Sequence, residues 1–92
     1  MSNIEGYLAI LTAIVQRQFG VLGKGKALDG ARQTGLSVLD NGTVTEFSGD
    51  GNSATKSLID CYVGYIGLTA KLGCIALVKK VAGEHGITLT DI

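Results

Sequence analysis

The apolar residues at the start of the chain recur at steps of four, three, four and four, which is the spacing of one helical face. They are Ile4, Leu8, Leu11, Val15 and Phe19. Ser2 or Asn3 can cap this first helix, and the glycine-rich residues 20–25 end it. A second, shorter helix is predicted over residues 26–34, with Gly35 just past its end.

The middle of the chain carries the pattern of a β-hairpin. Residues 36–40 and 43–47 flank Asn41-Gly42, a pair that favours a type I′ turn because both central residues must take positive φ. A two-stranded ribbon is only marginally stable alone. We therefore expect the hairpin to pack on helices or to extend its sheet across a partner.

A long apolar segment follows, which we expect to form one helix over residues 54–82, capped by Asn52 or Ser53. Two charged residues alone interrupt the apolar character between residues 58 and 78. A helix that is apolar on all sides must be enclosed by other elements. The segment thus predicts either a large internal core or a contact with another chain.

Three glycines lie inside this segment: Gly64, Gly67 and Gly73. Each costs a helix about 0.8 to 1 kcal/mol relative to alanine. Two arrangements are compatible with that cost. Either another backbone packs closely against the glycines, which we favour, or the helix kinks near Gly64 and Gly67.

These patterns predict a single α+β domain over residues 1–92, with three helices and one β-hairpin in the order α-α-β-β-α and a long apolar C-terminal helix. The length fits one domain, since most domains hold roughly 50 to 200 residues. Hydrophobic residues make up 46% of the chain and charged residues 17%, which excludes an intrinsically disordered protein.

Charge and segment length bear on the partners of the chain. Eight basic and eight acidic residues cancel, which argues against a dominant attraction to nucleic acid or to an anionic membrane and leaves room only for a local patch. The longest uncharged runs of the apolar segments, residues 6–16 and 61–70, are shorter than the ~20 residues of a membrane span. We therefore expect no membrane association.

The two cysteines and the chain start bear on location. In a continuous helix Cys61 and Cys74 lie about 20 Å apart, so a disulfide between them would need a sharp break in the helix. Buried thiols of a reducing compartment are the simpler interpretation. The first residues carry no basic region ahead of an apolar run, unlike a signal peptide. These features predict a cytoplasmic protein.

The sequence offers little material for catalysis. His85 is the single histidine, beside Glu84 at the predicted end of the last helix. A zinc site would need it together with Cys61 and Cys74, which lack the close spacing of metal ligands. The carboxylates are scattered along the chain. We therefore predict that the protein is not an enzyme and needs no metal or cofactor.

The glycine-rich region resembles that of KH domains, which clamp single-stranded nucleic acid over a G-x-x-G loop between two helices. Residues 21–28, followed by Arg32 and Gly35, carry the resemblance, although the closing glycine of the loop and the first strand of the family are absent. The resemblance implies that five residues contact nucleic acid: Gly23, Lys24, Gly25, Lys26 and Arg32.

A second resemblance covers more of the chain. Residues 22–32, 40–44, 48–50 and 65–70 form an ordered set of glycines and apolar positions. This set is similar to small helical tail modules found on some prokaryotic regulatory and sensor proteins. The resemblance implies a role in regulation or association without catalysis. Leu68 stands where such tails often carry a proline.

The apolar character of the last helix decides the predicted function. Three helices and a hairpin offer few elements to enclose it, whereas a second copy supplies more. We predict a non-catalytic interaction or regulatory module that self-associates as a homodimer through this helix. Another protein is a further partner to consider. The predicted interface comprises Tyr62, Ile66, Gly67, Ala70, Gly73 and Leu77. KH-like binding of single-stranded nucleic acid is the alternative, and a small-molecule sensor with an apolar pocket ranks third.

Overall fold

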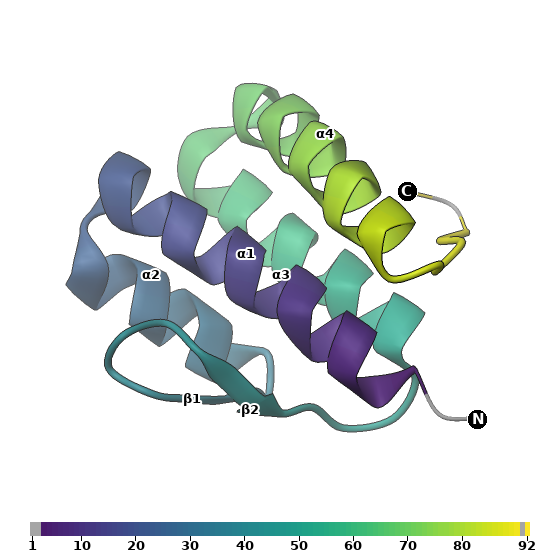
Figure 1. The fold of residues 1–92 in the computed structure, drawn as a ribbon. Helices are drawn as coiled ribbons and strands as arrows, with labels where there is room; N and C mark the ends of the chain where they lie inside the picture. Colours follow the sequence, from purple (N-terminus) through teal and green to yellow (C-terminus); the bar gives the residue numbers. More distant parts are fainter. Residues whose placement is uncertain (1–2, 91) are drawn as a thin grey trace.

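The computed structural model describes residues 3–90 and 92. Its elements are α1 (Ile4–Leu22), α2 (Lys24–Gln33), β1 (Ser37–Val38), β2 (Val44–Glu46), α3 (Gly51–Ile66) and α4 (Leu68–Glu84). The four helices form a bundle in which α1 packs against the other three, and the small antiparallel sheet lies beside α1 and α2 (Figure 1). The predicted α+β class is confirmed, but the described residues form four helices rather than three.

The single long C-terminal helix is the prediction that fails. Gly67 takes a φ of 91° and a ψ of −169°, which ends α3 and allows α4 to fold back against it (Figure 1). Glycine adopts positive φ without the penalty that a Cβ imposes. A Cβ on Gly64 would meet nothing within 4 Å. Of the two arrangements considered for the glycines, the break near Gly67 is therefore correct, and close packing at Gly64 is not.

The apolar character expected around the last helix is also not found. In α4 only one stripe is buried among the residues whose side chains the structure describes: Cys74, Val78 and Ala82. Leu68 and Leu72 point into solvent, and three lysines of the helix are exposed. The hairpin of α3 and α4 supplies within one chain much of the enclosure that we had assigned to a second copy.

One residue joins α1 to α2. The first helix runs past Gly20 and ends at Leu22, and Gly23 alone, with a φ of 87°, turns the chain into α2. The second helix thus begins at Lys24, two residues earlier than predicted. At its other end Gly35 has a φ of 88°, in agreement with its predicted place just past the helix.

The hairpin is present, but its turn differs from the predicted two-residue type. Leu39 N donates to Thr43 O at 2.9 Å and Gly42 N donates to Leu39 O at 2.9 Å, so residues 40–42 form a three-residue loop. Gly42 takes the positive φ, 88°, that such loops place at their last position. The strands pair Ser37 with Glu46 and Val38 with Val44, with an irregularity between them.

The ends of the α3–α4 hairpin are tied to the rest of the chain. Asp50, rather than the predicted Asn52 or Ser53, caps α3, because its Oδ2 accepts hydrogen bonds from Ser53 N at 3.1 Å and Ser53 Oγ at 3.2 Å. Asn52 instead holds the C-terminal segment, donating to Thr90 O at 3.0 Å and accepting from Thr90 N at 2.9 Å. Both contacts close the same end of the bundle.

The core draws on every helix and both strands. Its fully buried side chains include Ile10, Leu11, Ile14, Val15, Leu58, Tyr62, Cys74 and Val78. The chain exposes 5039 Å² of surface, close to the value of about 5,050 Å² expected of a compact monomer of this mass. The exposed area is thus that of a compact chain of this size.

Two glycines of α3 provide a matched test of this packing. The ring of Tyr7 lies where a Cβ on Gly51 would stand, whereas Gly64 faces open space. Gly51→Ala should lower the free energy of unfolding by about 1 to 3 kcal/mol through overpacking. Gly64→Ala should raise it by about 0.5 to 1 kcal/mol, since alanine is the better helix former. Urea unfolding of both variants measures this, and equal losses would contradict the packing described.

Candidate interaction surface

The described residues form no cluster of metal-ligating side chains. Among residues 3–90 and 92, no three histidine, cysteine, aspartate or glutamate side chains lie so that they could hold a metal ion. His85 is exposed at the C-terminal end of α4, and Cys61 and Cys74 are free thiols on α3 and α4. None of the helices, over the part of the chain that is described, has the length and apolar character of a membrane span.

The residues predicted to form an interface are dispersed in the structure. Tyr62 is fully buried in its own chain, where its hydroxyl donates to Ala27 O at 2.6 Å. This residue therefore cannot reach a second copy. Gly67 forms the turn between α3 and α4, and the side chain of Arg17 covers Gly73.

Three of the predicted interface residues remain: Ile66, Ala70 and Leu77. Ile66 and Leu77 are half-buried. The side chain of Ala70 lies outside the described part of the structure, although its backbone belongs to α4. A role for these three residues in association stays a prediction.

Exposed apolar side chains gather instead at the end of the bundle where α3 turns into α4. Four of the six large hydrophobic residues that are exposed among the described residues lie at this end. They are Val21 (55% exposed), Tyr65 (44%), Leu68 (72%) and Leu72 (72%), and we call this set the apolar tip. The sequence pattern does not predict Leu68 and Leu72 as contacts, because it indicates one continuous helix. In such a helix the two leucines do not lie at the end of a bundle.

Contacts between α1 and α4 place Val21 at the tip. A Cβ on Gly73 would lie 2.7 Å from Arg17 Nη2, and at the other end of the pair Ile87 packs against Gly6. The two helices therefore run antiparallel (Figure 1). Val21 is one helical turn beyond Arg17, which brings it level with the first turn of α4.

Cations surround the apolar tip. Residues 17–26 and 65–73, which carry it, contain four basic residues and no aspartate or glutamate: Arg17, Lys24, Lys26 and Lys71. In the described part of the chain the one salt bridge joins Arg32 and Asp40. Asp60 of α3 lines the same pocket as Lys71, so one carboxylate lies near the cations of the tip.

The glycine region does not form the loop that the KH resemblance implies. Lys24, Gly25 and Lys26 belong to the first turn of α2, where all three are exposed. Gly23 is the whole connection between the helices. The loop prediction is thus wrong, and the two lysines project from a helix rather than from a clamp.

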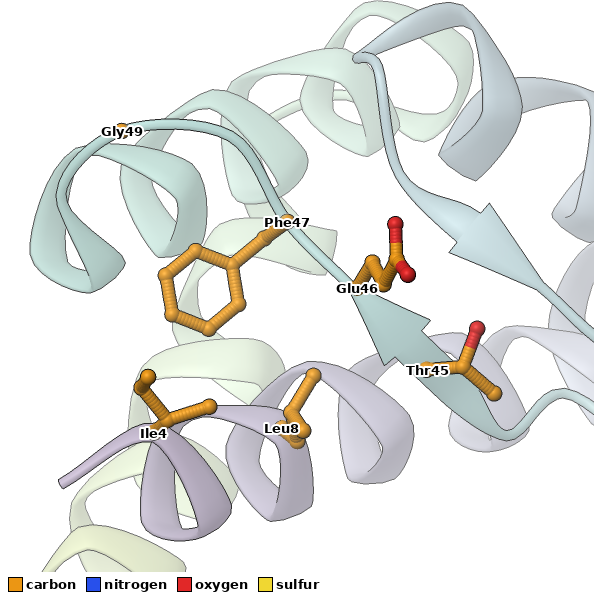
Figure 2. A pocket seen from close by; sticks show the side chains of 6 residues that line it. All are labelled: Ile4, Leu8, Thr45, Glu46, Phe47 and Gly49. Atoms are coloured by element: carbon orange, nitrogen blue, oxygen red, sulfur yellow. The ribbon is translucent and has the colours of Figure 1, made fainter. Parts of the chain in front are cut away.

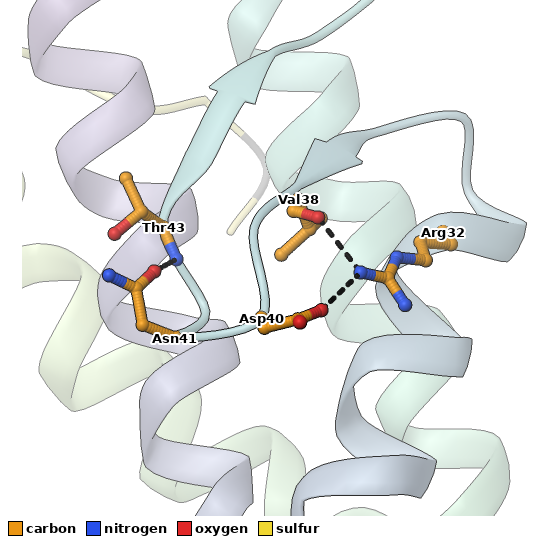
Figure 3. A network of polar contacts seen from close by, with 5 residues as sticks. All are labelled: Arg32, Val38, Asp40, Asn41 and Thr43. Carbon is orange, nitrogen blue, oxygen red and sulfur yellow. Dashed lines mark hydrogen bonds and ion pairs between the residues drawn. The ribbon is translucent and has the colours of Figure 1, made fainter.

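Arg32, the fifth residue of that resemblance, holds the hairpin against α2. Its Nη2 donates to Val38 O at 3.0 Å and to Asp40 Oδ1 at 3.4 Å (Figure 3). In the same turn Asn41 Oδ1 accepts from Thr43 N at 2.9 Å. These contacts give Arg32 a structural role, while its predicted contact with nucleic acid has no further support.

A second surface feature lies near the opposite end of α1. A hollow of about 310 Å³ opens between the start of α1 and the segment that follows β2 (Figure 2). We call it the α1–β2 hollow; its lining comprises Ile4, Leu8, Thr45, Glu46, Phe47 and Gly49. Ile4 and Leu8 project from α1 toward the ring of Phe47, which Tyr7 supports from the side at a ring distance of 6.1 Å.

The polar groups inside the bundle are held in their neutral forms. Burial raises the pKa of the Cys61 thiol. It also raises that of Cys74, an effect that Arg17 and a 3.2 Å hydrogen bond from Gln18 Nε2 oppose in part. Gln18 Oε1 is buried without a hydrogen-bond partner. A raised pKa lowers the fraction of nucleophilic thiolate at both cysteines.

Comparison with known proteins adds no relative. A scan against protein-family models, a search of curated proteins and a search of solved structures each find no match.

Tyr62 makes the interior testable through pH. Burial, with smaller effects of the neighbouring Cys61 and Cys74, raises the pKa of its phenol well above the ordinary value. Its contribution to stability is therefore complete below about pH 10 and is lost as the pH rises further, because the unfolded chain ionises first. Tyr62→Phe should lower stability at neutral pH by about 1 kcal/mol through the lost hydrogen bond.

The same variant should flatten the decline of stability above that pH. Urea unfolding of the wild-type chain and of Tyr62→Phe across the alkaline range provides the measurement. Parallel curves for the two proteins would show that the Tyr62 phenol does not carry this pH dependence.

Proposed function

We propose that the chain is a non-catalytic interaction module that self-associates through the apolar tip. The observation that carries the proposal is the exposure of Leu68 and Leu72, each 72%, one helical turn apart on α4. Val21 on α1 and Tyr65 on α3, whose ring lies beside Gly30 of α2, are exposed at the same end of the bundle. Exposed apolar patches with a polar rim are typical of surfaces that bind another protein.

The strength of such a contact can be bounded. Fully burying one leucine contributes about 1.5 to 3 kcal/mol. Association itself costs an estimated 4 to 15 kcal/mol in lost translational and rotational freedom. The two leucines alone cannot outweigh the upper part of that range, so the remaining tip residues and the surrounding charges must contribute. We therefore expect a weak, reversible association that depends on protein concentration.

Single-stranded nucleic acid binding has less support. Lys24 and Lys26 are exposed beside the tip, but the connection between the helices is a single residue and Arg32 is bonded to the hairpin. Phosphate attraction by two lysines is weak at physiological ionic strength. The lysines serve the proposed module better as the charged rim of its apolar surface.

Light scattering after size-exclusion chromatography, over a dilution series, tests the proposal. The wild-type chain should exceed its monomer mass of 9.5 kDa at high concentration and approach it on dilution. Leu68→Ser/Leu72→Ser should remain monomeric throughout, because it loses the apolar contact but not the core. Leu39→Ser is the matched control, since Leu39 is 52% exposed on the hairpin. A wild-type chain that stays monomeric at every concentration would refute self-association.

A further inference from the structure

From the two surfaces together, we infer that the copies associate head to tail, with the apolar tip of one chain seated in the α1–β2 hollow of the next. This inference rests on the proposed self-association and specifies its geometry. It replaces the symmetric dimer through the C-terminal helix with a contact between two different surfaces. The occupant of the hollow is then a second copy of this chain.

The chemistry of the hollow matches that of the tip. Its apolar wall comes from Ile4, Leu8 and Phe47, and it can receive the projecting leucines of α4. Glu46 lines its edge. The leucines of the tip can therefore contact the apolar wall of the hollow in the same arrangement in which a cation of the tip contacts Glu46.

Charge distinguishes this pairing from the symmetric one. Glu46 lines the hollow, and the segments that form it, residues 3–8 and 44–51, contain no lysine or arginine. The tip segments carry four cations, and Asp60, which lines a pocket with Lys71, offsets part of this charge. Tip against hollow thus brings opposite charges together, whereas tip against tip places like charges in contact, which is unfavourable.

The positions of the two surfaces determine what such a contact builds. Ile4 in the hollow and Val21 in the tip belong to opposite ends of α1 (Figure 1), about 26 Å apart at the rise of an α-helix. The tip of one chain therefore cannot reach the hollow of the same chain. A pair of chains leaves one tip and one hollow unoccupied. A heterologous contact of this kind continues to add copies unless its rotation closes a ring.

Two blocked variants test the geometry. The tip variant is Leu68→Ser/Leu72→Ser, which removes the exposed apolar side chains of α4 without adding a charge that could attract the hollow variant. The hollow variant is Ile4→Lys/Glu46→Lys, which places cations where the neighbouring tip would bring its own. All four positions are exposed, so the fold should survive, and thermal unfolding of each variant verifies this.

Each variant alone should be monomeric, with self-association reduced about thirtyfold or more, since each loses two apolar or charged contacts. The decisive sample is an equimolar mixture of the two. The hollow of the tip variant and the tip of the hollow variant are both intact, so the mixture should form a pair of discrete mass that cannot grow. Added salt should weaken this pair by screening its charges. Leu39→Glu is the control that should associate like the wild-type chain.

The outcomes separate the two proposals. A mixed pair from two monomeric variants supports the head-to-tail contact. A hollow variant that associates like the wild-type chain, with a tip variant that associates with nothing, would overturn it and favour a symmetric contact through α4. A mixture that stays monomeric while the wild-type chain associates would also overturn it. If the wild-type chain itself is monomeric, self-association fails first.

Discussion

The reversal of the chain at Gly67 determines how the rest of the molecule packs. Without it, α3 and α4 would form one long apolar rod with no neighbour along most of its length. With it, the two helices lie side by side, and both face α1. Tyr62 from α3 and Val78 from α4 are then completely buried in the same core. A chain of this size encloses its interior because one glycine takes a positive φ.

The same reversal leaves one end of the bundle uncovered. Two chain connections lie at that end: Gly23 joins α1 to α2, and Gly67 joins α3 to α4. Each is a single residue without a side chain, so neither can cover the apolar groups around it. The opposite end is different, because the segments around Asn52 and Thr90 fold over it and bond to each other. The exposure of Leu68 and Leu72 follows from this asymmetry in the connections.

Much of this fold is visible in the sequence, and the failures have a common physical cause. The periodicity of α1 and the turn at Asn41-Gly42 depend on local rules, and both elements are present. Whether a glycine inside an apolar helix breaks it depends on tertiary packing, and the apolar spacing continues across Gly67 without a change. The composition of the tip could not be predicted without that break. Its charge could, since residues 17–26 and 65–73 contain four basic residues and no aspartate or glutamate.

A net charge of zero therefore conceals two ends of opposite character, a cationic apolar tip and a hollow beside carboxylates. None of the tip side chains belongs to the buried core, so the association proposed above would leave the packing of the core unchanged. In the proposed association the stability of the fold does not depend on a partner. An obligate dimer differs, because its stability depends on its partner. A contact of this strength responds mainly to protein concentration and ionic strength. These dependences are the ones expected of the reversible self-association proposed above.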